Sequence, residues 1–476
     1  MTSYLNFDLE LGDFAAGPDG RWTYYVRAAG TPRAQVQSIQ AADRVEVPPG
    51  AMDKTVAVLA RRWDVPEDEF GRACLALEQW LLPAASRARA LLEASLTGLA
   101  DDESLLLRLR CRDDPLARLP WEFAAFDVAR LPDDGRFHAD RMLAMHPRIC
   151  VVRFEELTAP VERREQRAPR LLFATAAPPD METLALHVER TRIEAALADA
   201  KPLPEATWVE HTTIAKLQRS LLDAPFDVFQ FSGHGGSSRG GFLCLEREEL
   251  SDGTFEAEKL GLALSGKGVR LAVLAACVTA QVELELPWSS VARALVAGGV
   301  PAVVGMQLNI DDRSALEFLA TFYHALATCL PIGTAINEAR KRIGLLRELD
   351  RDFGVPVLYL RNAQGWDGVL FPPVHPEGAV ERGIRAADAY KRLHDALHKA
   401  KMDAFHLIMG YANDFPPKSG ASQRPLRSYV NTIKRCVSEM RGIVAEGHCD
   451  RDLIDPFVDA LDQATVQLES AVTHLD

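Results

Sequence analysis

A histidine and a cysteine each follow an apolar, strand-like run near the middle of this chain. Residues 226–231 lead into a Ser-Gly-His-Gly-Gly segment that contains His234, and residues 269–276 lead into Cys277. Such runs are typical of strands buried on both faces of a parallel sheet, where reactive groups gather at the carboxyl ends. The stretch between His234 and Cys277 is long enough for one crossover between neighbouring parallel strands.

These two residue types predict a thiol nucleophile with an imidazole base, as in a cysteine endopeptidase. A thiol with its ordinary pKa of about 8.5 is mostly protonated at neutral pH. A nearby imidazole removes that proton or holds the thiolate as an ion pair, and it then protonates the leaving amine. Because water hydrolyses the resulting thioester, we expect the reaction to need no cofactor and no metal.

Short motifs around and after these two residues follow one another in a fixed order. They are Phe231-Ser232-Gly233-His234-Gly235-Gly236, Leu274-Ala275-Ala276-Cys277 and the segments 297–304, 322–327 and 355–361. In order and spacing they resemble the CHAT family of caspase-like peptidases over residues 168–372. The resemblance extends more weakly to the first 155 residues through Leu119-Pro120-Trp121-Glu122-Phe123, and residues 380–476 lie outside it.

The resemblance implies a caspase-like fold in which His234 and Cys277 form the catalytic dyad. It also implies an oxyanion hole made by the backbone N–H groups of Gly235 and Cys277, and one such donor contributes roughly 3 kcal/mol to transition-state stabilisation. The caspase signature Gln-Ala-Cys-x-Gly is absent, because the run here is Ala276-Cys277-Val278-Thr279. That departure argues against aspartate specificity of the caspase type.

Acidic residues after the nucleophile strand are candidates for a specificity pocket. Relatives of this fold often use a carboxylate to select Arg or Lys before the scissile bond. The candidates here are Glu283, Glu285, Asp311 and Asp312. The alternative is that Asp311 or Asp312 only caps the next helix and that both glutamates are solvated.

Three regions follow one another along the chain. Residues 1–157 predict an α+β region, residues 168–375 a caspase-like catalytic domain, and residues 380–476 a small helical bundle. Alternating strands and helices in the second region predict an α/β fold with a doubly wound, mostly parallel sheet. Helices are expected between 67 and 99, at 188–198 and 214–222, from Ser289 or Ser290 to 297, and from Asp311 or Asp312. Strands are expected at 23–27, 105–109, 149–154, 171–176, 208–211, 242–245 and 302–305.

Apolar residues recur at helical spacing in three stretches of the last hundred residues, beginning near Tyr390, Leu426 and Ile454. Three such helices joined by short loops can bury their apolar faces against one another. The bundle either stabilises and covers the peptidase or recruits other molecules, like the adaptor domains often fused to this family. A regulatory protein partner is therefore expected to bind through it.

Composition restricts the class of protein. The chain is 25% charged and 47% hydrophobic, with a formal net charge of −13, which argues against a general surface for nucleic acid or anionic membranes. No apolar stretch is long enough to span a bilayer, and the start of the sequence does not resemble a signal peptide. The 8 cysteines contain no C-x-x-C pair, so a reducing cytoplasm is expected.

Two functions remain open. The first is an endopeptidase of a bacterial regulatory or immune system, which cuts a partner protein after an activating signal. The second is a weakly active or inactive scaffold that keeps the fold and acts through its helical domain. Residues 278–302 contain no Asp or Lys, and their single arginine, Arg293, falls inside a predicted helix. We therefore expect an enzyme that stays a single chain and is switched on by a partner.

Overall fold

The computed structural model describes most of the chain before residue 372. The described residues are 3–30, 39–100, 103–126, 141–155, 168–181, 184–200, 203–236, 241–249, 251–278, 287–346, 350–361 and 368–371, with only the backbone of 3, 276–278 and 287–290. The chain divides into two compact units, Met1–Pro373 and Val374–Asp476. The predicted helical bundle falls in the second unit, outside the described residues.

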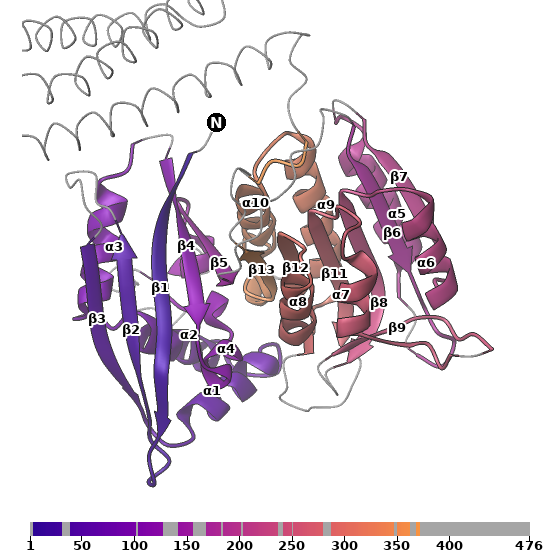
Figure 1. Cartoon of the computed structure of the whole chain (residues 1–476). Helices are drawn as coiled ribbons and strands as arrows, with labels where there is room; N and C mark the ends of the chain where they lie inside the picture. Colours follow the sequence, from indigo (N-terminus) through magenta and orange to yellow (C-terminus); the bar gives the residue numbers. More distant parts are fainter. Residues whose placement is uncertain are drawn as a thin grey trace, which may run out of the picture. The chain divides into compact units, whose positions relative to one another are not determined.

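The described strands form one 13-stranded sheet, which extends across the whole first unit (Figure 1). Its order is β10-β9-β8-β11-β12-β13-β5-β4-β1-β2-β3, and β6 pairs with both β8 and β7. The strands are β1 (Ser3–Ala16), β2 (Trp22–Gly30), β3 (Ile39–Val47), β4 (Glu103–Cys111), β5 (Ile149–Glu155), β6 (Arg170–Thr175), β7 (Glu205–Val209), β8 (Val228–Gly236), β9 (Phe242–Cys244), β10 (Thr254–Glu256), β11 (Leu271–Val278), β12 (Ala302–Met306) and β13 (Pro356–Arg361).

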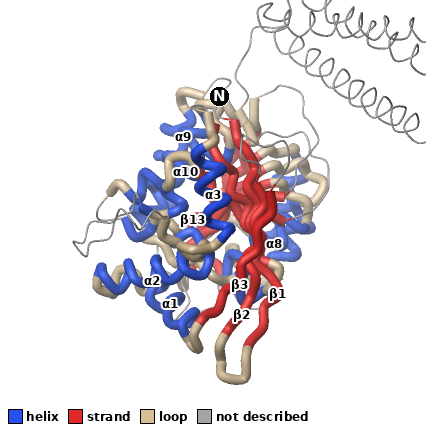
Figure 2. Tube along the Cα trace, turned by 90° about the vertical axis from the view of Figure 1, so that its left-hand side faces the viewer, coloured by secondary structure: helices blue, strands red, loops and turns tan. Residues whose placement is uncertain are grey.

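Helices cover both faces of this sheet. In Figure 2 the strands form a band with α1, α2, α9 and α10 on one side and α8 on the other. The α-helices are α1 (Ala51–Ala60), α2 (Glu67–Leu81), α3 (Arg87–Thr97), α4 (Asp114–Ala117), α5 (Leu186–Leu197), α6 (Ile214–Asp223), α7 (Ala257–Leu264), α8 (Pro287–Ala297), α9 (Asp312–Ala327) and α10 (Ile332–Gly344). Short 3-10 helices are η1 (Trp121–Phe123), η4 (Leu143–Met145) and η6 (Asp350–Asp352). The predicted α/β class with a doubly wound, mostly parallel sheet is confirmed.

The central strands form where the sequence is apolar without alternation. Every residue of β8, β12 and the first half of β11 is buried, as expected for strands covered by helices on both faces. Strands β6, β7, β8, β11 and β12 are mutually parallel, and β11 lies between β8 and β12. The carboxyl ends of β8 and β11 therefore meet at one edge of the sheet.

Two local predictions were wrong. Strict βαβ alternation fails after β12, because two helices, α9 and α10, follow it and β13 returns antiparallel to it. Ser289 and Ser290 do not cap α8, which already begins at Pro287. Strand β13 of the second predicted region pairs with β5 of the first, so one sheet continues across the predicted boundary near residue 157.

A buried ion pair links the N-terminal region to the end of β12. Both carboxylate oxygens of Glu122 accept hydrogen bonds of 2.7 Å from Arg153 on β5. Gln307, directly after β12, donates to the same carboxylate at 3.0 Å and to the carbonyl of Gly354 at 2.6 Å. Burial alone raises the pKa of Glu122, but the charge and hydrogen bonds of Arg153 outweigh it and hold that pKa below its usual value. The carboxylate is therefore ionised and bridges two segments far apart in the sequence.

A second buried pair fastens the loop that follows β12. Arg62, after α1, donates from Nε to Asp352 Oδ1 at 2.7 Å, and the indole N–H of Trp63 donates to the same oxygen at 3.0 Å. The other oxygen of Asp352 accepts from the backbone N–H of Asp311 at 3.3 Å. Arg62 and Asp352 are almost wholly buried. The N-terminal helices thereby hold the segment in which α9 begins.

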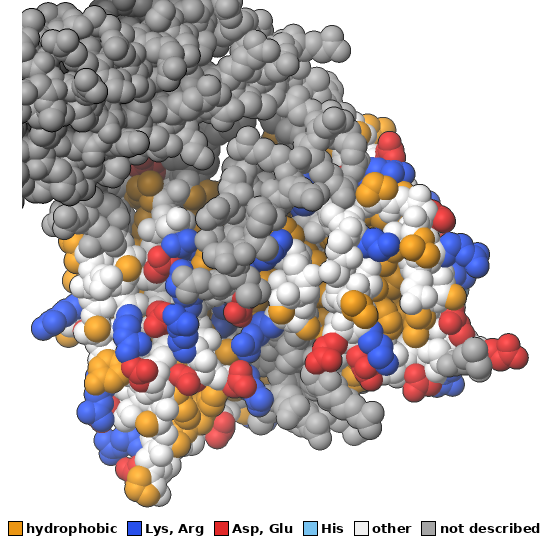
Figure 3. All heavy atoms as spheres, viewed as in Figure 1, with side chains coloured by type: hydrophobic (Ala, Val, Ile, Leu, Met, Phe, Trp, Pro, Cys, Tyr) orange, Lys and Arg blue, Asp and Glu red, His pale blue; other side chains and the backbone are white. Residues whose placement is uncertain are grey.

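Charges of both signs are interspersed on the surface. Figure 3 shows Lys and Arg side chains among Asp and Glu over the strands that begin the chain. On these strands Arg27 contacts Glu10 and Asp13, and Arg112 contacts Glu10 at 2.8 Å. The ion pairs leave this face without a continuous basic stripe among its described residues. In the described part of the chain, no helix is long and apolar enough to cross a membrane.

The first prediction concerns the Glu122–Arg153 pair. Replacing Glu122 by Ala leaves the Arg153 guanidinium buried without its counter-charge, which typically lowers the free energy of unfolding by about 3–5 kcal/mol. Urea denaturation of the two proteins measures the loss. Glu205→Ala is the control, because Glu205 forms a 2.9 Å ion pair with Arg170 but is 65% exposed. Equal losses in the two variants would contradict the assignment of Glu122 as a buried structural charge.

Candidate active site

The register of two adjacent strands brings the predicted dyad together. β8 and β11 run parallel, and the Cα atom of Cys277 is the register partner of the Cα atom of His234. Gly235 is the partner of Val278, one residue further along. Partners on neighbouring strands lie about 5 Å apart and on the same face of a sheet. The histidine side chain is fully buried.

Close packing explains the glycines that flank this histidine. A Cβ atom at Gly233 would lie 2.7 Å from both the carbonyl oxygen of Ala176 and the ring of Phe231. At Gly236 it would lie 2.5 Å from the ring of Phe242 on β9. Neither glycine has a positive φ angle, so space and not backbone conformation excludes a side chain at both positions. The two glycines therefore let β6 and β9 approach the end of β8.

A buried hydrogen-bond network lies along the same face of β8 as His234. Gln230 Nε2 donates to Glu189 of α5 at 2.7 Å and to the hydroxyl of Ser232 at 2.9 Å. The Ser232 hydroxyl donates to the same glutamate oxygen, and the hydroxyl of Tyr323 on α9 donates to Gln230 Oε1 at 2.6 Å. Helices α5 and α9 are thus tied to the strand that carries the candidate base.

Glu189 carries a perturbed carboxyl group. Burial raises its pKa to about 7, the nearby charge of Asp312 adds to the rise, and the hydrogen bonds from Ser232 and Gln230 offset part of it. A buried carboxyl that ionises near neutral pH is a common feature of functional sites. Such carboxyl groups also occur in purely structural networks. The raised pKa therefore points to a functional role for Glu189 only together with its hydrogen bonds to the strand of His234.

A second cysteine lies on the other side of His234. Cys244 on β9 is the antiparallel register partner of His234. Burial raises the pKa of its thiol to about 11, and the negative charges of Asp180 and Asp252 add to the rise. That thiol stays protonated at neutral pH and is a poor nucleophile. Burial likewise raises the pKa of the thiols of Cys74, Cys111, Cys150 and Cys329.

The structure also locates two of the predicted pocket acids. Asp311 is the N-cap of α9, where its carboxylate accepts from the backbone N–H of Arg313 at 2.9 Å. Asp312 begins the helix and is exposed. Both follow β12 at the edge of the sheet that carries the ends of β8 and β11. Asp311 therefore caps the helix, as the alternative interpretation expected, and Glu283 and Glu285 lie outside the described residues.

Sequence reasoning missed the network around Glu189. One signal was available, because Gln230, Ser232 and His234 are polar at every second position of an otherwise apolar strand. No such signal singled out Glu189, since α5 also contains Glu194, Arg190 and Arg192. Among the described residues, no group of three or more His, Cys, Asp or Glu side chains is placed to hold a metal ion.

The chain is therefore an α/β protein with a histidine and a cysteine in register at the carboxyl edge of adjacent parallel strands. Residues 109–352, more than half of the chain, match the CHAT domain family. The chain belongs to the CHAT family of caspase-like cysteine peptidases, as its motifs predicted. The match includes the segment around Glu122, which was the weakest part of the resemblance.

Similar solved structures are distant. A chain of the Saccharomyces cerevisiae separase–securin complex has 10% identity and a TM-score of 0.41, with 75% of this chain and 30% of that chain covered. Caspase-1 from Spodoptera frugiperda has 10% identity and a TM-score of 0.29, with 43% of this chain and 94% of that chain covered. This chain thus spans 30% of the length of the yeast chain that it matches. A search of curated proteins gives no match.

The second prediction concerns the pH dependence of stability. The pKa of Glu189 is higher in the folded chain than in the unfolded chain, so the stability linked to its protonated form is lost as pH rises through about 7. For a pKa raised from its ordinary value of 4.5 to about 7, this loss is on the order of 3 kcal/mol. We expect urea denaturation to give a smaller decline between pH 5 and 8 in Glu189→Gln than in the wild type. Parallel declines in the two proteins would show that Glu189 does not titrate in this range.

Proposed function

We propose that this protein is a cysteine endopeptidase that uses a His234–Cys277 dyad to cleave a partner protein. The register between the two residues carries the proposal, because it joins a base and a nucleophile from segments distant in the sequence. Membership of a peptidase family supports the same reaction class. The biological setting proposed is a bacterial regulatory or immune system in the cytoplasm.

His234 acts in two steps of the proposed reaction. Its imidazole takes the proton of the Cys277 thiol as the sulfur attacks the scissile carbonyl carbon. The sulfur–carbon bond forms, the carbonyl oxygen becomes an oxyanion, and the backbone N–H groups of Gly235 and Cys277 stabilise that charge. The imidazolium then protonates the leaving amine, and water hydrolyses the thioester. One of the two proposed oxyanion-hole donors is the backbone N–H of Cys277 itself. The other, the N–H of Gly235, comes from the neighbouring strand β8.

The alternative proposal is a scaffold that keeps this fold with little or no activity. A scaffold has no need of a histidine and a cysteine in register, nor of glycines that admit neighbouring strands so closely to the histidine. These features favour the enzyme. Labelling of Cys277 by a thiol-reactive peptide probe separates the two proposals, since a scaffold would not need an activated thiol.

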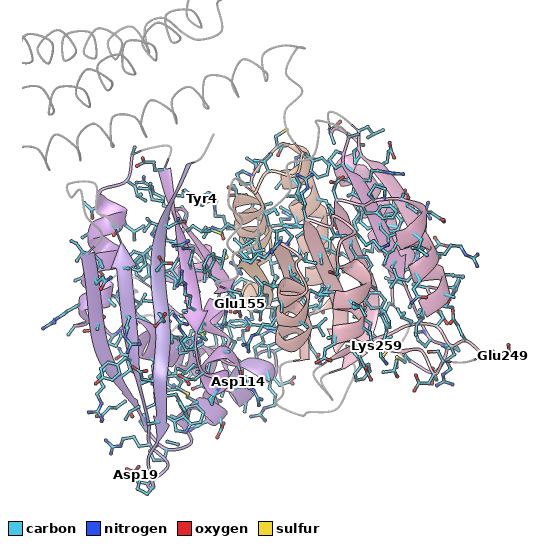
Figure 4. All side chains as sticks on the ribbon, viewed as in Figure 1. Tyr4, Asp19, Asp114, Glu155, Glu249 and Lys259 are labelled. Atoms are coloured by element: carbon cyan, nitrogen blue, oxygen red, sulfur yellow. The ribbon has the colours of Figure 1, made fainter. Side chains whose placement is uncertain are left out.

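Activation by a protein partner is part of the proposal. Arg293 lies within α8 and pairs with Asp114 at 3.2 Å and with Glu155 at 3.3 Å, two carboxylates labelled in Figure 4. A protease would have to unwind this helix to cut beside Arg293. Since residues 278–302 contain no Asp or Lys, a switch by a partner, through the C-terminal or N-terminal region, is the simpler route.

The third prediction tests the dyad. Cys277→Ala is expected to abolish hydrolysis of a fluorogenic peptide library, because the nucleophile is lost. His234→Ala is expected to lower the rate roughly 10²–10⁴-fold, the usual contribution of a general base. Circular dichroism and thermal melting check that both variants keep the fold.

Controls for this test use the same proteins. Cys244→Ala removes the neighbouring thiol and is expected to leave activity within about twofold, since its raised pKa keeps it protonated. Full activity in Cys277→Ala would refute the mechanism. Intact masses of the wild type and Cys277→Ala after incubation test the single-chain proposal. Two wild-type fragments divided between residues 278 and 302, absent from the variant, would refute it.

The fourth prediction concerns specificity. We propose an acidic subsite that selects Arg or Lys before the scissile bond, because mismatched charges in a buried pocket are strongly unfavourable. Since Asp311 caps α9, the remaining candidates are Asp312, Glu283 and Glu285. Peptide-library profiling is expected to give Arg or Lys at this position, and Asp312→Asn is expected to weaken that preference. A preference for Asp or large apolar residues would exclude the subsite.

A further inference from the structure

The polar residues of β8 form a line that ends at His234. Gln230, Ser232 and His234 lie at alternate positions and therefore on one face of the strand. All three are at most 1% exposed, and Tyr323, which donates to Gln230, is fully buried. Cα register partners on β11 for these positions are Val273, Ala275 and Cys277. The face that carries the dyad is thus the face that carries the network.

Glu189 of α5 contributes an ionisable carboxyl group to the hydrogen-bond network along β8. One oxygen, Oε1, accepts from both Gln230 and Ser232, so the carboxylate is bound to two residues of the strand at once. Its own helix is held in place from outside, because Arg192 of α5 pairs with Glu317 of α9 at 2.7 Å. Helix α5 therefore presents a carboxyl group to Ser232, two positions before the candidate base.

We propose that Glu189 is a positioning residue for His234, which fixes the end of β8 and supplies a negative charge that favours the imidazolium–thiolate form of the dyad. This inference rests on the proposed function, since it acts on the same dyad. Ser232, which donates to Glu189, lies two residues or about 7 Å before His234 along the strand, and charges in a buried site still interact over several ångströms. An ionised Glu189 would thus lower the pH at which the Cys277 thiol reacts.

The charge of Glu189 depends on pH over the range in which a peptidase works. Burial places its pKa at about 7, so the carboxyl is mainly neutral at pH 5.5 and mainly ionised at pH 8. The effect on the dyad should therefore appear only above neutral pH. A purely structural carboxyl would instead change the reactivity of Cys277 by a similar factor at every pH.

Other ionisable groups lie on the elements around β8 and α5, and their effects on the pH profile must be distinguished from that of Glu189. On the neighbouring elements they are Asp312, Arg313, Glu317, Tyr323 and His324 of α9, His234 of β8, Asp227 before it, Arg170 of β6, and Glu205 of β7 with Glu210 after it. The charge of Asp312 raises the pKa of Glu189, and that of Glu189 adds to the burial that raises the pKa of Tyr323. Asp312→Asn therefore should lower the pH at which Glu189 ionises.

The rate of alkylation at Cys277 tests the inference without a known substrate. The full-length chain is treated with iodoacetamide between pH 5.5 and 9.5, and modification of Cys277 is followed by peptide mass spectrometry. Glu189→Gln removes the charge and keeps the shape of the side chain. Glu194→Gln is the matched control, because Glu194 lies on the same helix but is 48% exposed and pairs with Arg190.

We expect Glu189→Gln to slow alkylation roughly threefold to tenfold between pH 7 and 8. The rates of Glu189→Gln and the wild type should converge at pH 5.5, where Glu189 is neutral, and at pH 9.5, where the thiol is ionised in both. Glu194→Gln should match the wild type throughout. The inference is overturned if the alkylation rate of Glu189→Gln follows that of Glu194→Gln at every pH. It is also overturned if Glu189→Gln slows alkylation by the same factor at all pH values.

His234→Ala separates this inference from the proposed function. If Cys277 in the wild type titrates near an ordinary thiol pKa and His234→Ala changes nothing, the dyad itself is refuted. If His234→Ala slows the reaction but Glu189→Gln does not, only the role of Glu189 is refuted.

If Glu189→Gln fails to fold, Ser232→Ala is a second variant that tests the role of Glu189. The Ser232 hydroxyl lowers the pKa of Glu189, so its removal should shift the pH at which alkylation accelerates upward. An unchanged profile in this variant overturns the inference.

Discussion

The parallel register between β8 and β11 is the constraint on which the candidate site depends. Side chains alternate with a period of two, so a slip of one residue would move His234 to the opposite face from Cys277. Burial of both strands on both faces resists such a slip, because it would carry Gln230 and Ser232 into apolar surroundings. The hydrogen bonds of these two residues to α5 therefore help to specify the register as well as the geometry of the site.

Buried charges connect this register to the rest of the fold. Glu122 and Arg153 anchor Gln307 after β12, and Asp352 joins Arg62 to the beginning of α9. An isolated buried charge is unfavourable, so each pair needs both of its segments in place at the same time. Helix α9 in turn supplies Tyr323, which donates a hydrogen bond to Gln230 in the network that precedes His234 on β8. These contacts connect the N-terminal region to the strand of His234, which offers a physical route for the proposed control by a partner.

The sequence predicts the parts of this structure that depend on local pattern. Apolar runs around Val228 and Leu271 identify the strands that carry the candidate dyad, and Asp311 begins its helix as an N-cap. Pairing between distant strands is not encoded locally, so neither the antiparallel β13 nor the continuation of the sheet through β5 could be foreseen. Glu189 was missed for the same reason, because only the packing of α5 against β8 distinguishes it from other glutamates.

Two cysteines are in register with His234, and in the proposed mechanism only one of them is the nucleophile. Cys244 and Cys277 occupy the same register position on opposite sides of one imidazole. Burial and the charges of Asp180 and Asp252 keep the Cys244 thiol protonated, so it can neither attack a carbonyl nor form an ion pair with the imidazolium. In the proposed mechanism the imidazole then has a single productive partner, on β11. Negative charge on the β9 side thus disfavours a thiolate at Cys244, whereas the charge proposed at Glu189 would favour the imidazolium of His234.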